Sequence, residues 1–177
     1  EEVDRFLKRG VERLLSMQLA GGGLSYWPGE LNTSWWGTMY ASFELITARQ
    51  AGYEVPEESL KRALTFLHED LFKKKESDKY HGATWTRELA LFNLAVGKML
   101  SAQELEPFFQ EYDSLNDEGK ALLILSAKEV GYLQQDKLKE MVAQLNPKFD
   151  PNRTDYHNSS FRELAVCLMA ALETGAA

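Results

Sequence analysis

Apolar residues recur along this chain with two kinds of helical periodicity. Four segments carry one apolar stripe between charged residues, and they span 3–19, 56–71, 101–112 and 138–145. Four others are apolar on most sides: 35–50, 84–96, 117–130 and 164–172. A helix with one stripe lies on a surface, whereas a helix that is apolar all round is enclosed on several sides. The alternation therefore predicts four hairpins, each made of an outer and an inner helix.

Residues that satisfy free backbone groups mark the predicted helix ends. The first stripe predicts one buried face, made of Val3, Phe6, Leu7, Val11, Leu14 and Leu15. Two sequences are typical of capping boxes, Ser101–Glu104 and Ser160–Glu163. N-cap candidates precede two inner helices: Thr33 or Ser34, and Asn116 or Asp117. Each inner helix ends at a glycine: Gly52, Gly97, Gly131 and Gly175.

The lengths of the connections predict how the hairpins are arranged. Turns after the first three inner helices are short, whereas most loops that lead into inner helices are long, as at 20–33, 73–83 and 146–158. This pattern predicts parallel inner helices with the long loops gathered at their N-terminal ends. The spacings between the terminal glycines are irregular, which favours a toroid over a strict repeat array. We therefore expect an all-α chain: a single domain over 1–177, forming an incomplete α/α toroid with an inner parallel ring and an outer ring.

Composition limits the classes of function. The 177 residues are 44% hydrophobic and carry a formal net charge of -7, with acids and bases interspersed. Without a basic stripe, we expect no nucleic-acid partner. No apolar run reaches the roughly 18 residues of a membrane span. The sequence begins abruptly in a helical pattern at Glu1 and stops at Ala177, shortly after the last predicted helix, and we expect a fragment of a longer protein. Cys167 is the single cysteine, and its apolar surroundings predict a buried thiol.

Aromatic residues gather between the first two predicted helices. Three of the four tryptophans, Trp27, Trp35 and Trp36, lie within ten residues there, after a triple glycine. We expect Trp35 and Trp36 in the core, because an inner helix needs large apolar anchors. Trp27 precedes a proline in the loop, and the sequence leaves open whether it faces a partner or the core.

Two long loops carry the other candidate residues. Tyr80 and His81 precede one inner helix, and Tyr156 and His157 precede another, so these four residues and Trp27 are candidates for a partner-facing loop surface. His157 has acidic neighbours, but their spacing is not that of a calcium loop, and one histidine without a nearby cysteine argues against zinc. We therefore expect no metal site. His68–Asp70 is expected to be polar surface.

Several motifs together resemble a known family. Met17-Gln18, Gly22 to Trp27, and the pattern from Trp35 to Pro56 are similar to the thioester domain of bacterial alpha-2-macroglobulins. Arg87–Gly97 and Lys120–Gly131 resemble its following inner helices. The resemblance covers nearly the whole chain and implies an α/α toroid within a protease-trapping inhibitor, not an enzyme. It also implies an extracytoplasmic location in the bacterial periplasm or envelope, with target proteases and other domains of the parent chain as partners.

The family's covalent chemistry depends on a Cys-x-Glu-Gln motif, whose cysteine and glutamine form an internal thioester. Cleavage of a bait region exposes this thioester to a nucleophile on the protease. The motif does not occur in this sequence, where Cys167 is followed by Leu-Met-Ala. Either it lies upstream of Glu1 or the parent lacks a thioester. In complement-type relatives a loop histidine assists acyl transfer, which makes His81 a candidate catalytic residue by resemblance alone. No cofactor is implied.

Two other classes of function stay open on the residues alone. An α/α-toroid enzyme that acts on carbohydrates, or a terpene-cyclase relative, needs clustered carboxylates or metal ligands at the inner-helix N-termini. The loops here offer one acid each, at Glu30, Asp78, Asp117 and Asp155. The third possibility is a helical-repeat scaffold that binds protein. An incomplete toroid would also expose apolar flanks, and this predicts self-association through the open edge.

Overall fold

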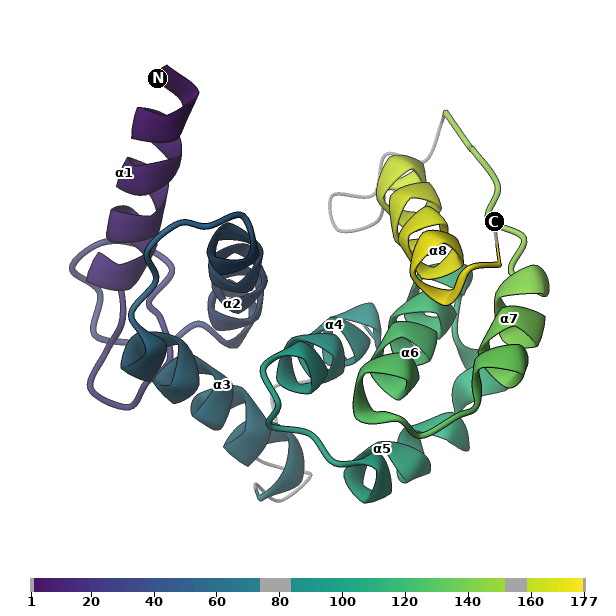
Figure 1. Ribbon diagram of the computed structural model, residues 1–177. Helices are drawn as coiled ribbons and strands as arrows, with labels where there is room; N and C mark the ends of the chain where they lie inside the picture. The colour runs from purple at the N-terminus through teal and green to yellow at the C-terminus, as the bar shows by residue number, and fades with distance from the viewer. Residues whose placement is uncertain (1, 74–83, 152–158, 177) are drawn as a thin grey trace. The chain divides into compact units, whose positions relative to one another are not determined.

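The computed structural model describes residues 2–73, 84–151 and 159–176, and these residues form an all-α chain (Figure 1). Two compact units divide it, Glu1–Gly82 and Ala83–Ala177. The described elements of the first unit are α1 (Glu2–Ser16), α2 (Trp35–Gln50) and α3 (Glu57–Phe72). Those of the second are α4 (Thr84–Val96), α5 (Ala102–Phe109), the 3-10 helix η2 (Tyr112–Ser114), α6 (Asp117–Val130), α7 (Gln135–Ala143) and α8 (Ser160–Thr174). None of the described helices is long and apolar enough to cross a membrane.

In the first unit, α2 packs against both α1 and α3. Its N-cap is Ser34, whose side chain accepts a hydrogen bond from the Gly37 amide at 3.0 Å, as the sequence predicts. The buried core comes mainly from α2 and α3, and includes Met39, Leu45, Ala63, Leu64 and Leu67. These residues recur at helical spacing because each helix turns one face to its neighbour.

The first helix departs from the prediction of a fully buried face. Helix α1 ends at Ser16, and of its apolar stripe only Val11 is buried. Leu14 is half-buried, whereas Val3, Phe6 and Leu7 are exposed. The stripe is therefore longer than the surface that α2 offers to it, and the first two turns of α1 stay open to solvent.

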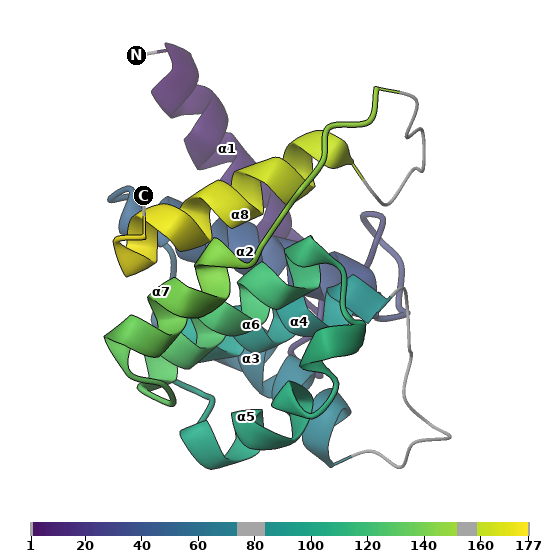
Figure 2. The same ribbon diagram turned by 90° about the vertical axis from the view of Figure 1, so that its right-hand side faces the viewer.

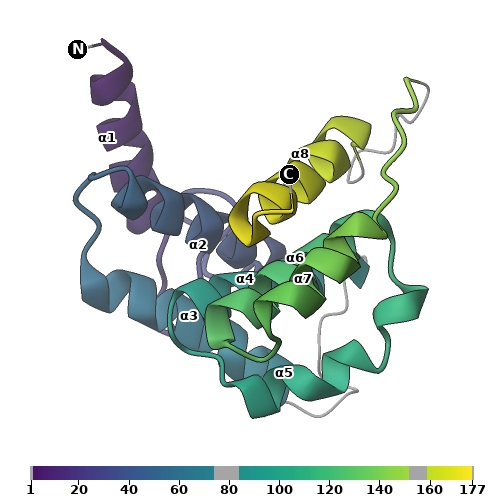
Figure 3. The same cartoon turned by 45° about the vertical axis from the view of Figure 1, so that its right-hand side comes forward.

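In the second unit, α4, α6 and α8 run parallel (Figure 2). Arg162 near the start of α8 pairs with Glu118 near the start of α6, and Lys128 near the end of α6 pairs with Glu173 near the end of α8. Pairing of like ends requires the same direction, so the predicted parallel inner helices are found within this unit. Helix α5 packs against α6, and α7 packs against both α6 and α8 (Figure 3).

Helices α6 and α8 have similar apolar sequences but differ in how deeply they are buried. Every residue from Ala121 to Ala127 of α6 is buried, which confirms the enclosure predicted for this helix. Helix α8 is different, since Phe161, Leu168 and Leu172 are exposed. The prediction that α8 is enclosed is wrong for that side, because among the described helices of its unit the main packing partners of α8 are α6 and α7.

Two of the predicted helix boundaries are also wrong. Ser160 with Glu163 is not a capping box: Ser159 is the N-cap without a side-chain bond, and the Ser160 hydroxyl donates to the Asp150 carbonyl at 3.0 Å. Helix α5 does not reach position 112, because Pro107 lies inside it and the chain tightens into η2 soon after. The Ser101–Glu104 capping box, the Asn116 cap, and the left-handed ends at Gly131 and Gly175 are confirmed.

Candidate functional site

The glycine-aromatic loop, residues 17–34, is a compact structure fixed on α2. Two isolated antiparallel bridges, Gln18 with Leu24 and Ser25 with Thr33, hold its backbone together. The Leu24 amide donates to the hydroxyl of Thr38 on α2 at 2.8 Å. Because Thr38 is fully buried, this bond ties the loop to the core of the first unit.

The same loop is bonded to α3. The Gln18 side-chain amide donates to the carbonyl oxygens of Gly22 and Ser59, at 2.8 and 2.7 Å, and the Arg62 guanidinium donates to the Leu19 carbonyl at 2.7 Å. Gly22 has φ +91°, and a Cβ there would lie 2.4 Å from the Arg62 carbonyl oxygen. Only glycine allows the loop and α3 to approach this closely.

Aromatic rings form a continuous row from this loop onto α2. Trp27 meets Tyr26 edge-on with ring centroids 5.1 Å apart, Tyr26 lies 5.9 Å from Trp36, and Trp36 lies 4.5 Å from Tyr40. Trp35 is only 7% exposed, which confirms its predicted place in the core. Trp36 is half-buried, whereas Trp27 at the end of the row is 62% exposed. Trp27 therefore lies outside the core of its own unit, and its role in contacting a partner stays a prediction.

The groups in this loop suit contact rather than catalysis. Residues 14–48 contain no Lys, Arg, His or Cys, so this stretch supplies no thiol, imidazole or amine. Glu30 supplies one carboxylate, and its Oε2 already accepts the Trp27 backbone amide at 3.1 Å. Trp27 and Leu31 are exposed and provide apolar contact area. Because the loop backbone is already ordered, binding a partner would cost little backbone conformational entropy.

The second unit carries a buried carboxylate on α4. The Glu88 side chain is fully buried, its Oε1 lies 3.0 Å from the Arg87 guanidinium, and its Oε2 has no hydrogen-bond partner among the described residues. Arg87 also bonds Glu111 at 2.8 Å. Burial raises the pKa of Glu88, and the charge of Arg87 only partly opposes this. Burial lowers the pKa of Arg87, but its two carboxylates raise it by more, so Arg87 stays charged.

A second buried carboxylate joins α6 to α8. Arg162 bonds Glu118 with both ends of its guanidinium, Nε to Oε1 at 2.7 Å and Nη2 to Oε2 at 3.2 Å. The Glu118 side chain is 3% exposed. This bidentate geometry is the strong form of the Arg–carboxylate pair, and it fixes the register of the two helices.

Cys167 lies five residues after Arg162 on α8. It is a free, buried thiol, as predicted, and its sulfur lies 3.6 Å from the Asp117 carbonyl oxygen. Burial, with the nearby carboxylates of Asp117 and Glu163 next in weight, raises its pKa to about 12. A thiol with this pKa is almost entirely protonated at neutral pH and is therefore a poor nucleophile.

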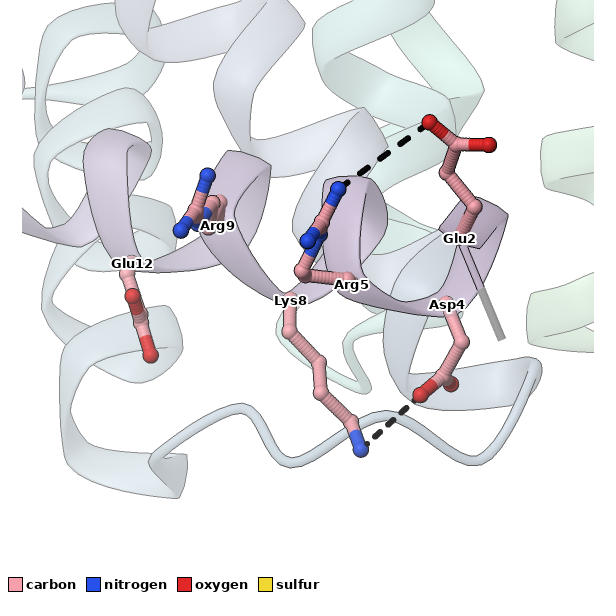
Figure 4. A pocket seen from close by; sticks show the side chains of 6 residues that line it. All are labelled: Glu2, Asp4, Arg5, Lys8, Arg9 and Glu12. Atoms are coloured by element: carbon pink, nitrogen blue, oxygen red, sulfur yellow. Dashed lines mark ion pairs between the residues drawn. The ribbon is translucent and has the colours of Figure 1, made fainter.

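A cavity of about 690 Å³ borders the charged face of α1 (Figure 4). Its six lining side chains are three acids and three bases: Glu2, Asp4, Arg5, Lys8, Arg9 and Glu12. Arg5 lies 4.0 Å from Glu2, and Lys8 lies 3.1 Å from Asp4. All six residues are exposed, so these are solvated surface pairs of small energetic weight, and the cavity indicates no chemistry.

Of the five loop-surface candidates, Trp27 lies within the described residues. Tyr80, His81, Tyr156 and His157 lie outside the described residues, as do the candidate acids at 78 and 155. The expectation for Asp70 is wrong, since it is 3% exposed rather than polar surface. Within the described ranges, no three His, Cys, Asp or Glu side chains are grouped to hold a metal ion.

The buried carboxylates Glu88 and Glu118 are the polar residues that the sequence reading missed. Both stand near the start of helices whose central residues are mostly apolar, each within reach of an arginine. The sequence signal for them was an acidic residue in a helix predicted to be enclosed. Such a residue is buried only if a partner of opposite charge or a hydrogen-bond donor accompanies it.

No family model matches this sequence, and no curated protein matches it. Several solved structures match this chain. Native alpha-2-macroglobulin from Escherichia coli, spanning domain MG7 to the C-terminus, matches 95% of this chain with a TM-score of 0.72 and 20% identity. The E. coli protein activated by porcine elastase matches 95% with a TM-score of 0.74 and 22% identity. Salmonella alpha-2-macroglobulin reacted with methylamine matches 94% with a TM-score of 0.70 and 22% identity. This chain has the fold of a bacterial alpha-2-macroglobulin segment.

The resemblance inferred from residues 17–56 is thereby confirmed at the level of the fold. The chain spans only 28%, 16% and 11% of the lengths of these three alpha-2-macroglobulin chains. It corresponds to one part of a much larger molecule in each of them.

Proposed function

We propose that this chain is a non-catalytic segment of the thioester domain of an alpha-2-macroglobulin-like protein that traps proteases. The observation that carries the proposal is the match of 94–95% of the chain to bacterial alpha-2-macroglobulins in three solved structures. The family-like motif at 17–56 adds support, because its glycines, Thr38 and Trp35 have structural roles that a related chain would need.

The chemistry of the described residues supports a non-catalytic role. The sequence has no Cys-x-Glu-Gln, and Cys167 is buried with its pKa raised to about 12. Covalent capture would therefore need a thioester supplied from outside these residues. The alternative is a parent without a thioester that holds proteases by enclosure alone.

The proposal extends to architecture, location and partners. Residues 1–177 would be one domain, an incomplete α/α toroid, in an extracytoplasmic bacterial protein. The complete parent protein, rather than this chain alone, would bind target proteases. Other domains of the parent would pack on this domain. The exposed apolar sides of α1 and α8 support such packing, because side chains like Phe6 and Leu168 are costly to leave in water. Trp27 is the proposed loop contact, and His81 keeps its candidacy by resemblance only.

Methylamine tests the thioester part of the proposal in the complete gene product that carries this chain. The amine nitrogen attacks the thioester carbonyl, an amide forms, and the cysteine sulfur leaves as a thiol. We expect one new thiol per molecule, counted with a thiol reagent under native conditions. Buried Cys167 adds little background, and a Cys167→Ser variant should keep the full increment. No increment would rule out the covalent version.

A further inference from the structure

Glu88 on α4 is a fully buried carboxylate that is only half satisfied. Its Oε1 accepts a hydrogen bond from Nε of Arg87 at 3.0 Å, whereas its Oε2 has no hydrogen-bond partner among the described residues. The buried carboxylate of Glu118 is different, because both of its oxygens bond Arg162. An ionised carboxylate with an unsatisfied buried oxygen is costly, and a proton on that oxygen removes the charge and with it most of the cost.

Arg87, the cation beside Glu88, is shared with a second carboxylate. Its Nη2 lies 3.0 Å from Oε1 of Glu88 and 2.8 Å from Oε2 of Glu111. The Arg87 guanidinium also lies over the Phe108 ring, 5.2 Å from the ring centroid. Phe108 belongs to α5, and Glu111 lies between α5 and η2, so Arg87 links α4 to the α5–η2 segment, residues 102–114. Two carboxylates therefore compete for one guanidinium.

The charged residues of α6, the helix that packs against α4, have other partners. These contacts are Asp117 with the Asn146 amide, Glu118 with Arg162, Lys120 with the Tyr112 ring, Lys128 with Glu173, and Glu129 with Lys98. Among the described residues, the charged groups that act on the Glu88 carboxyl are Arg87, which favours its ionised form, and Glu111, which favours its neutral form. Burial has the largest influence, and it raises the pKa of Glu88.

We propose that Glu88 is a proton-binding site that controls how Arg87 is shared between α4 and the α5–η2 segment. While Glu88 is neutral, Arg87 bonds Glu111 and holds the segment on α4. When Glu88 loses its proton, a buried negative charge competes for the same guanidinium and weakens the bond to Glu111. This coupling is reciprocal, so Glu111 must oppose the ionisation of Glu88 through Arg87. The contact between α4 and the segment is therefore tighter at pH values where Glu88 is neutral and looser where it is ionised.

Urea unfolding of the full chain at a series of pH values tests the proton site. Folding raises the pKa of Glu88 above its ordinary 4.5, so the stabilisation by its neutral form is complete below 4.5 and is lost as the pH rises through the folded value. Glu88→Gln is the reference, because its amide stays neutral at every pH. The folded-to-unfolded ratio of the wild type, relative to that of Glu88→Gln, should fall by up to about tenfold per pH unit across this window and then level off. A relative ratio that does not change with pH would overturn the proposal.

Carbon-13 NMR titration of the glutamate carboxyl groups in the full chain tests the competition for Arg87. One wild-type resonance should titrate at higher pH than those of the exposed glutamates, and Glu111→Gln should move its midpoint to lower pH, because Arg87 is then left to Glu88. This shift also identifies the Glu88 resonance if Glu88→Gln does not fold.

The matched control for Glu111→Gln is Glu106→Gln. Glu106 is an exposed acid on α5, whereas the carboxylates that bond Arg87 are those of Glu88 and Glu111. Glu106→Gln should therefore leave the midpoint unchanged. The proposal is overturned if no glutamate has a raised midpoint, if Glu111→Gln leaves that midpoint in place, or if both variants shift it equally.

Discussion

Replacing Gly22 by alanine should destabilise the first unit by about 3–5 kcal/mol, because two separate costs add. A residue with a side chain is strained at φ +91°, and its Cβ would lie 2.4 Å from the Arg62 carbonyl oxygen. That carbonyl is backbone within α3 and cannot move away as a flexible side chain could. Urea denaturation of both proteins measures the difference in the free energy of unfolding.

Gly21 is the matched control for that substitution. It is the preceding residue, its φ is not in the left-handed region, and a Cβ there would meet nothing within 4 Å. Gly21→Ala should change stability by less than about 1 kcal/mol. If both variants lost the same stability, the triple glycine would be acting through loop flexibility, and the close approach to α3 would not be its reason.

Removing Arg162 should cost the second unit about 3–5 kcal/mol. The substitution Arg162→Ala takes a bidentate cation from Glu118, whose side chain is 3% exposed. A carboxylate at that depth loses far more from its missing partner than a solvated one does. Thermal or urea unfolding of Arg162→Ala against the wild type gives the value.

The other end of the same helix pair supplies the comparison. Lys128 pairs with Glu173, but that pair is much more exposed, so Lys128→Ala should cost less than about 1 kcal/mol. Replacing both members of the buried pair, Glu118→Leu with Arg162→Met, should recover most of the loss, because no charge is then left buried. Similar costs at both ends, or no recovery in the double variant, would show that burial does not govern the pair.

The sequence was a good guide wherever a local signal decided the structure. Ser101 caps the helix that it was expected to cap, and Ser34 and Asn116 are each one of the two candidates named for their helix, because N-capping needs only a side-chain oxygen and a nearby amide. It failed where the outcome depended on a distant partner. The Ser160 hydroxyl bonds Asp150, ten residues away, rather than its own helix. The apolar stripe of α1 is longer than the surface of α2 that covers it. The periodicity of α1 alone could not show this.

The same limit applies to the site. Clustered aromatics and glycines made residues 21–45 stand out, and Trp35 could be assigned to the core from its place on an inner helix. The exposure of Trp27 could not be predicted from the sequence, because it depends on how the loop is hydrogen-bonded to Thr38 and Arg62. Arg13 on α1 and Glu44 on α2 are 31 positions apart in the sequence. They line the same cavity only because the two helices pack together.

Capture of trypsin by the complete gene product tests the central claim, that this chain is part of a protease trap, most directly. After a short incubation, the mixture is separated by size under native conditions and the fractions are assayed for trypsin. The account predicts that trypsin elutes with the gene product once the latter has been cleaved, with a denaturing gel showing whether the link is covalent. Trypsin that cleaves the gene product and still elutes entirely alone would contradict it.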